Sequence, residues 1–281
     1  MDYAAELRDR CWMWGHDTGV YDGADNVYNI PVSAPVTMCD ACRYMGIPNV
    51  CVVRWFPATQ DRAYLEDFRK ARRFSWVACG DHRWATKYQL ADGCLAAMKD
   101  FPNMTGMDFD DFFNAAAPNE VQNCSDGAQE VSPGCFTLEE MEDYRRRLAG
   151  LGRPRCPEIK LVLYSGQLDK LIKPAIDRVD TVLFWTWSGS DLARLRGNFA
   201  KYRRIAPGKP TLLGIYMWDF GGRKPIGMDY MKHQLGIALE FFREGKIEGL
   251  VFHCTPLVNK NIGAVEYCRK WLDRHAGETR R

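Results

Sequence analysis

Short apolar runs, rich in β-branched and aromatic residues, alternate with amphipathic stretches along the whole chain. Eight of these runs have the length and composition of β-strands, and each is followed by a segment with helical periodicity. The expected strands are 11–16, 49–55, 73–80, 104–111, 160–166, 181–187, 211–219 and 249–255. The expected helices are 36–45, 61–72, 88–101, 137–149, 168–177, 191–205, 228–244 and 261–275. An unbroken order of strand then helix, repeated eight times, predicts a closed parallel barrel.

The expected fold class is therefore α/β, a single (β/α)8 TIM barrel that spans residues 1–281 as one catalytic domain. The alternative is a doubly wound open sheet, which normally carries a glycine-rich phosphate turn after its first strand. Here residues 14–19 read Trp-Gly-His-Asp-Thr-Gly, and no dinucleotide-binding or P-loop motif occurs. The long irregular segment at about 114–136 follows the fourth strand, and we expect it to form a lid or a substrate wall.

Charge and hydropathy argue against two classes of partner. Lysine and arginine number 38 and acidic residues 36, which gives a net charge of +2. This balance produces no long-range attraction to polyanions, so nucleic acid is not an expected partner. No apolar stretch reaches the roughly 18 residues of a membrane span, so we expect no membrane contact. The amino terminus shows no secretory signal pattern, which indicates a cytoplasmic protein, or an exported one if a signal peptide has been removed.

The 11 cysteines are interpreted mainly as buried free thiols, which pack like small hydrophobic residues. Cys39 and Cys42 form a C-x-x-C pair on an expected helix, but a second pair at zinc spacing is missing. Cys124 and Cys135 share the 114–136 segment and could form a disulfide in an oxidising compartment. Cysteine usage thus favours a reduced compartment and leaves this one pairing open.

Acidic residues cluster at the end of the fourth expected strand, where residues 106–113 read Gly-Met-Asp-Phe-Asp-Asp-Phe-Phe. Because side chains alternate along a strand, Asp108 and Asp110 should both point into the barrel mouth, with Asp111 at the rim. Carboxyl groups this close cannot all ionise freely, so one of them should have a raised pKa. A protonated carboxyl beside an ionised one is the pair that glycoside hydrolysis uses. The alternative is an acidic strand end that is exposed to solvent or caps a turn.

Aromatic and hydrogen-bonding side chains also gather at the expected strand ends, where barrels of this type carry their chemistry. Sugar rings stack their C–H faces on aromatic rings, while their hydroxyls bind carboxylates, arginine, glutamine and histidine. The candidates for substrate binding are His16, Asp17, Arg54, Trp55, Tyr164, Gln167, Trp185, Trp187, Tyr216, Trp218 and His253. The end of the third strand adds Asp81, His82 and Trp84. The alternative for the tryptophans is packing in the barrel core.

Asp219 is the candidate for a second catalytic carboxylate, because it ends the seventh expected strand. Its alternative role is an ion pair with Arg223 or Lys224. In the glycosidase interpretation the acid is Asp110 or Asp111. The base or nucleophile is then Asp108 or Asp219.

Three short segments resemble glycoside hydrolases. Residues 105–112, Thr-Gly-Met-Asp-Phe-Asp-Asp-Phe, resemble the fourth-strand signature D-G-x-D-x-D-x-E of chitinase-type enzymes. The segment departs from the signature at Thr105, in place of the first aspartate, and at Phe112, in place of the catalytic glutamate. Residues 185–187 and 216–221 look like sugar-site strand ends of the same broad superfamily. The resemblance implies a TIM-barrel glycoside hydrolase, without indicating a particular family.

The sequence therefore predicts hydrolysis, or else transfer, of a glycosidic bond in a carbohydrate substrate, with no cofactor and no metal. One alternative is a metal-dependent TIM-barrel isomerase, aldolase or hydrolase. Its ligands would come from Asp108, Asp110, His16, His82 and His253. Another alternative is a sugar-binding barrel without catalysis, which the missing glutamate would allow. The sugar, its linkage and the oligomeric state stay open.

Overall fold

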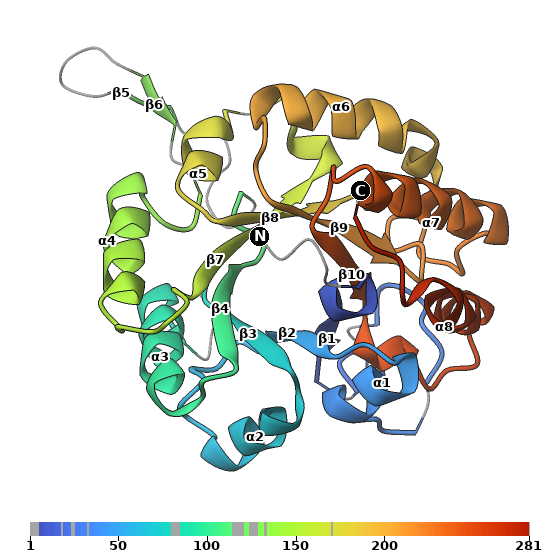
Figure 1. Cartoon of the computed structure of the whole chain (residues 1–281), viewed down its shortest axis with the longest axis horizontal. Helices are drawn as coiled ribbons and strands as arrows, with labels where there is room; N and C mark the ends of the chain where they lie inside the picture. Colours follow the sequence, from blue (N-terminus) through green and yellow to red (C-terminus); the bar gives the residue numbers. More distant parts are fainter. Residues whose placement is uncertain are drawn as a thin grey trace.

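Eight parallel strands form a closed barrel in the computed structural model (Figure 1). Each strand pairs with the next along the chain, and the last pairs with the first. The structure describes residues 6–17, 19–23, 26–32, 34–79, 85–113, 121–123, 129–131, 134–169 and 171–280. The barrel strands are β1 (Cys11–His16), β2 (Asn49–Val53), β3 (Arg73–Val77), β4 (Met104–Phe109), β7 (Glu158–Tyr164), β8 (Thr181–Trp185), β9 (Thr211–Tyr216) and β10 (Gly249–His253).

A helix follows each barrel strand and packs on the outside of the barrel, as Figure 1 shows. The α-helices are α1 (Met38–Met45), α2 (Arg62–Asp67), α3 (Lys87–Asp100), α4 (Leu138–Ala149), α5 (Lys173–Asp177), α6 (Leu195–Ile205), α7 (Met228–Arg243) and α8 (Gly263–His275). Short 3-10 segments are η1 (Arg8–Arg10), η2 (Phe68–Lys70), η3 (Ser165–Gln167), η4 (Gly189–Arg194) and η5 (Thr255–Leu257). The expected (β/α)8 TIM barrel is confirmed.

Local sequence explains where several helices begin. Thr137 accepts a hydrogen bond from the backbone N–H of Glu140, and the Glu140 side chain accepts one from the backbone of Thr137. Thr86 and Gln89 form the same capping box at α3. Each box satisfies backbone donors that the first helical turn leaves without a partner.

All the barrel strands except β1 end earlier than expected at their carboxyl ends. β4 stops at Phe109 and β9 stops at Tyr216, whereas the sequence pattern extends to 111 and 219. After β4 the chain turns out of the sheet, as the positive φ of 47° at Asp111 shows. Asp110, Asp111 and Asp219 therefore lie on loops above the barrel.

Two further strands, β5 (Val121–Asn123) and β6 (Gln129–Val131), pair antiparallel in the connection between β4 and α4. Most of the segment 114–136 lies outside the described residues, so its role as a lid or substrate wall stays a prediction. Cys124 lies there too, and its pairing with Cys135 is likewise untested. The cysteines that the structure describes form no disulfide, and Cys39 and Cys42 are both buried on α1. No helix in the described part of the chain is long and apolar enough to cross a membrane.

Candidate active site

A cavity of about 120 Å³ lies at the carboxyl ends of the barrel strands. Several of its lining side chains are the last residues of their strands: His16 on β1, Tyr164 on β7, Trp185 on β8, Tyr216 on β9 and His253 on β10. Of the residues predicted from sequence, the cavity brings together His16, Asp110, Asp111, Tyr164, Trp185, Trp187, Tyr216 and His253. The wall also contains Trp14, Tyr21, Tyr28 and Phe220.

Asp110 and Asp111 form the acidic side of the cavity. The backbone N–H of Asp111 donates a hydrogen bond to Oδ1 of Asp110 at 2.9 Å. Asp111 adopts the left-handed backbone region, which aspartate tolerates better than most residues. Its Oδ1 accepts a hydrogen bond of 3.1 Å from the Tyr164 hydroxyl. The turn after β4 thus presents two adjacent carboxyl groups to one cavity.

The pKa of Asp110 is raised well above its usual range. Burial is the largest cause, since only 7% of the residue is exposed, and the neighbouring charge of Asp111 adds to it. The hydrogen bond from the backbone of Asp111 opposes the shift without cancelling it. Asp110 is therefore the member of the acidic cluster whose pKa is raised, which is the direction expected from the sequence.

Aromatic rings surround the carboxyl groups. Trp187 lies edge-on to Tyr164, with ring centroids 5.9 Å apart, and edge-on to Tyr216 at 5.6 Å. Trp14 meets Trp185 edge-on at 5.6 Å. Trp185 packs against the backbone of Gly214 on β9, where any Cβ would overlap the indole ring. Such mutual packing fixes the ring orientations, so the cavity wall is rigid.

Two polar atoms in the wall have no hydrogen-bond partner among the described residues. They are Nδ1 of His253 and Nε1 of Trp185, and both atoms are buried. Burial lowers the pKa of His253 well below its usual value, and the nearby His16 lowers it further. Burial also lowers the pKa of His16 to about 4. Both imidazoles are therefore neutral at physiological pH, and the two unpartnered atoms lie buried in the cavity wall.

Asp108 does not reach this cavity, which corrects the expectation that it faces the barrel mouth. Its side chain is fully buried deeper in the barrel, 3.2 Å from Nζ of Lys160 on the neighbouring strand β7. Ser75 donates a hydrogen bond of 2.5 Å to Oδ2 of Asp108 and accepts one of 2.7 Å from Lys160. The carboxylate is thus committed to a buried ion pair.

Asp219 also lies outside the cavity lining. Its Oδ1 accepts hydrogen bonds from the backbone N–H groups of Gly189, at 2.9 Å, and Gly222, at 2.8 Å. The expected alternative partner Lys224 pairs with Asp219 through backbone atoms instead of through an ion pair. Asp219 therefore ties the loop after β8 to the loop after β9.

Asp17 and Arg54 form a separate cluster beside the barrel mouth. Nε of Arg54 lies 3.2 Å from Oδ2 of Asp17, and the Tyr64 hydroxyl donates to Oδ1 of Asp17 at 2.6 Å. The guanidinium carbon of Arg54 is 4.0 Å from the centre of the Tyr64 ring. Trp55 packs half-buried against the hydrophobic core. None of these residues lines the cavity.

Gln167 and Trp218 position cavity residues without lining the cavity. The Gln167 side chain accepts a hydrogen bond of 3.0 Å from the backbone N–H of Tyr164. The Trp218 indole donates one of 3.0 Å to the backbone carbonyl of Tyr28. These contacts fix Tyr164 and Tyr28, which are both in the wall.

Asp81, His82 and Trp84 fall outside the described residues, so their predicted place at the third strand end is untested. Within the described part of the chain, no group of three or more His, Cys, Asp or Glu side chains is arranged to hold a metal ion.

Sequence reasoning did not propose Tyr21 or Tyr28 as site residues, and it included Phe220 only as part of the segment 216–221. Tyr21 and Tyr28 lie in the irregular connection between β1 and α1, where no periodic pattern points to the cavity. Phe220 follows Asp219 and contacts Tyr28 edge-on, with centroids 5.0 Å apart. The sequence signal for Tyr21 and Tyr28 is limited to the presence of two tyrosines in the loop that follows the first strand.

Comparison with known proteins shows a shared fold. Active domain 2 of a thermostable chitinase from Pyrococcus furiosus matches with a TM-score of 0.59 and 14% identity, over 99% of each chain. The GH99 endo-α-mannosidase from Bacteroides thetaiotaomicron matches with a TM-score of 0.55 and 10% identity, over 95% of this chain and 97% of its own.

A third match has different chemistry. A probable 2-pyrone-4,6-dicarboxylic acid hydrolase from Acinetobacter baumannii reaches a TM-score of 0.50 at 10% identity, over 96% of this chain and 93% of its own. No protein-family model matches the chain, and a search of curated proteins finds no similar sequence. The chain thus resembles TIM-barrel glycoside hydrolases in fold, and its chemistry must be argued from its own residues.

Proposed function

We propose that this protein is a glycoside hydrolase that cleaves a glycosidic bond in the aromatic-lined cavity at the barrel mouth. The observation that carries the proposal is the raised pKa of Asp110 beside a second carboxyl group, Asp111, in that cavity. The glycoside hydrolase fold of the chitinase and the mannosidase supports the same class. We take residues 1–281 as one catalytic domain that acts on a carbohydrate without a cofactor.

Asp110 is the proposed general acid. A buried carboxyl group with a raised pKa keeps its proton near neutral pH and can give it to the leaving oxygen. Asp111 is the proposed partner, because Asp108 is committed to an ion pair and Asp219 to backbone amides. The hydroxyl of Tyr164 orients the Asp111 carboxylate, which then activates a water molecule or attacks the anomeric carbon itself.

The aromatic wall is the proposed sugar-binding surface. Trp187, which is only partly buried, would offer its ring to the apolar side of a sugar, and the buried rings of Trp185 and Tyr216 pack behind it. The unpartnered Nε1 of Trp185 and Nδ1 of His253 would bind its hydroxyl groups. In this assignment His16 is a neutral neighbour that keeps His253 in place, through an edge-on ring contact with centroids 5.5 Å apart.

A sugar-binding barrel without turnover is the second candidate, and Phe112 is the observation that favours it. This residue occupies the position of the catalytic glutamate in the chitinase-type signature. It is fully buried and stacks on Phe109, with centroids 5.7 Å apart. Position 112 therefore supplies no carboxylate to the cavity.

The proposal is tested with a panel of aryl glycosides and an Asp110→Asn variant. We expect wild-type turnover on at least one member of the panel, and a loss of about a hundredfold or more in kcat/KM in the variant. Asp229→Asn is the matched control, because Asp229 is an exposed aspartate in the first turn of α7. Sugar binding without turnover in the wild type would support the second candidate and refute hydrolysis.

The pH profile tests the role of Asp110 directly. A general acid works only while protonated, so kcat/KM should fall as pH rises through the raised pKa of Asp110. The Asp110→Asn variant should lose this alkaline limb in its residual activity. The anomeric configuration of the product then shows how Asp111 acts. Inversion indicates that Asp111 is a general base, and retention indicates that it is a nucleophile.

A further inference from the structure

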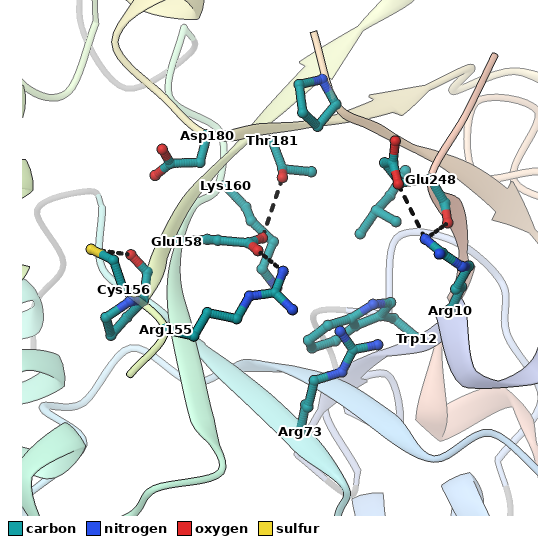
Figure 2. Close-up of a pocket in the computed structure, with 13 residues that line it drawn as sticks. Arg10, Trp12, Arg73, Arg155, Cys156, Glu158, Lys160, Asp180, Thr181 and Glu248 are labelled. Carbon is teal, nitrogen blue, oxygen red and sulfur yellow. Dashed lines mark hydrogen bonds and ion pairs between the residues drawn. The ribbon is translucent and has the colours of Figure 1, made fainter. Parts of the chain in front are cut away.

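A second cavity, of about 380 Å³, opens at the opposite end of the barrel, where the strands begin (Figure 2). Trp12 on β1, Arg73 on β3 and Lys160 on β7 contribute to its wall. Arg10 and Arg155 approach from the segments before β1 and β7. We call this space the floor cavity. It shares no lining residue with the cavity at the barrel mouth.

Most charges around the floor cavity are already paired. Arg10 binds Glu248 at 3.1 Å, and Arg155 binds Glu158 at 2.7 Å, as Figure 2 shows. Glu248 also binds Arg280, at 2.6 Å. The remaining acid in the wall, Asp180, binds Arg145 at 3.2 Å, outside the cavity. The carboxylates of the wall are therefore engaged by cations.

Arg73 is different, because no carboxylate in the described part of the chain lies within 4 Å of its guanidinium group. Its Nε donates to Oδ1 of Asn49 at 3.1 Å, and its Nη2 donates to the backbone carbonyl of Asp9 at 2.6 Å. Both acceptors are neutral. Burial lowers the pKa of Arg73, and the positive charge of Arg155 lowers it further. Glu158, which binds Arg155, opposes this shift without cancelling it, so Arg73 holds a half-buried positive charge without a direct ion pair among the described residues.

The surroundings fix this guanidinium in place. Its central carbon lies 5.0 Å from the centre of the Trp12 ring, and the two neutral acceptors hold two of its nitrogens. In Figure 2 the Arg73 and Arg155 side chains both reach toward Trp12. A guanidinium with spare N–H groups, a second guanidinium and a flat indole ring therefore meet in one concave space.

We propose that the floor cavity binds a small oxyanion, a carboxylate or a phosphate, through Arg73 with help from Arg155. The planar fork of a guanidinium matches the two oxygens of either group and binds them through charge-assisted hydrogen bonds. An anion would supply the negative charge that Arg73 lacks. The cavity also has room for the organic part of such a ligand.

The test is calorimetric titration of the full chain with inorganic phosphate and, separately, with citrate, at constant ionic strength. We expect saturable binding of at least one anion, and the preferred anion identifies the phosphate or carboxylate type. Arg73→Gln should weaken that binding about tenfold or more. Arg72→Gln is the matched control, since Arg72 is exposed and pairs with Asp9, and it should keep wild-type affinity.

Two results would overturn the proposal: no saturable binding of either anion to the wild type, or equal affinity in Arg73→Gln. If Arg73→Gln does not fold, the same titration is done with Arg155→Gln. This variant should fold normally, because 74% of the Arg155 side chain is exposed. This variant should weaken binding severalfold. Unchanged anion affinity in Arg155→Gln would then contradict the proposed oxyanion site.

Discussion

The buried pair of Lys160 and Asp108 should be the most sensitive electrostatic contact in the barrel. Nζ and Oδ1 lie 3.2 Å apart, with 1% and 0% of the two side chains exposed. At an effective dielectric constant of about 20, this separation corresponds to an attraction of roughly 5 kcal/mol. Burial alone would lower the pKa of Lys160, but Asp108, with smaller contributions from Cys51 and Glu158, outweighs it and holds that pKa above its usual value.

Lys160→Met should therefore lower the free energy of unfolding by about 3–5 kcal/mol, because it leaves a buried carboxylate whose hydrogen bond from Ser75 comes from a neutral group. The double variant Lys160→Met/Asp108→Asn removes both charges and should be less destabilised than Lys160→Met alone. Lys173→Met is the control: Lys173 pairs with Asp177 on an exposed helix face, and its loss should cost less than about 1 kcal/mol.

Urea unfolding of these variants, with the slope m unchanged, gives each free-energy difference. The reasoning fails if Lys160→Met costs less than about 1 kcal/mol, or if the double variant loses the sum of the two single losses. Asp108→Asn tests whether Asp108 stabilises the fold without taking part in the reaction. Its folded fraction should keep glycosidase activity, since Asp108 lies away from the cavity that Asp110 lines.

Two further predictions concern the wall of the mouth cavity. Burial lowers the pKa of His16 from 6.5 to about 4, so the unfolded state binds a proton at this residue at higher pH than the folded state does. The free energy of unfolding should therefore decrease, by up to roughly 3 kcal/mol, as the pH falls below about 6.5. His16→Gln should weaken this acid sensitivity in urea midpoints taken at about pH 7 and pH 5, while His233→Gln, on the exposed face of α7, should leave it unchanged. Gly214→Ala should destabilise the fold by about 1–3 kcal/mol and lower sugar affinity, because the new methyl group overlaps Trp185. Gly236→Ala, with open space around its Cα, should instead be neutral or stabilising, and similar thermal unfolding of both variants would contradict the packing argument.

The order of strands and helices was predictable because hydrophobic periodicity is a local property of the chain. The strand ends were not. Asp219 leaves the sheet because it binds the backbone of Gly189, thirty positions earlier, and no local pattern records that contact. Asp111 likewise turns out of β4 with a positive φ, where the composition still reads as strand.

Side-chain alternation placed the acidic residues only in part. It put Asp110 at the mouth, where the structure finds it, but it could not distinguish its depth from that of Asp108. Two positions along a strand span roughly 6.6 Å, enough to separate the cavity from the barrel interior. The partner that holds Asp108, Lys160, comes from the neighbouring strand, and only the register between β4 and β7 brings them together.

That register has a topological consequence. β4 and β7 are neighbours in the sheet, but the chain between them, residues 110–157, makes the longest excursion between consecutive barrel strands. Asp108 and Lys160 are directly opposite each other across this seam. Doubling the length of a flexible connection costs only about 0.6 kcal/mol in closure entropy, well below the effect of breaking a buried pair. Insertions in this connection, outside α4 and the turn that holds Asp110 and Asp111, should therefore cost less than the buried pair at the seam contributes, which makes them a low-cost route by which this barrel can acquire new specificity.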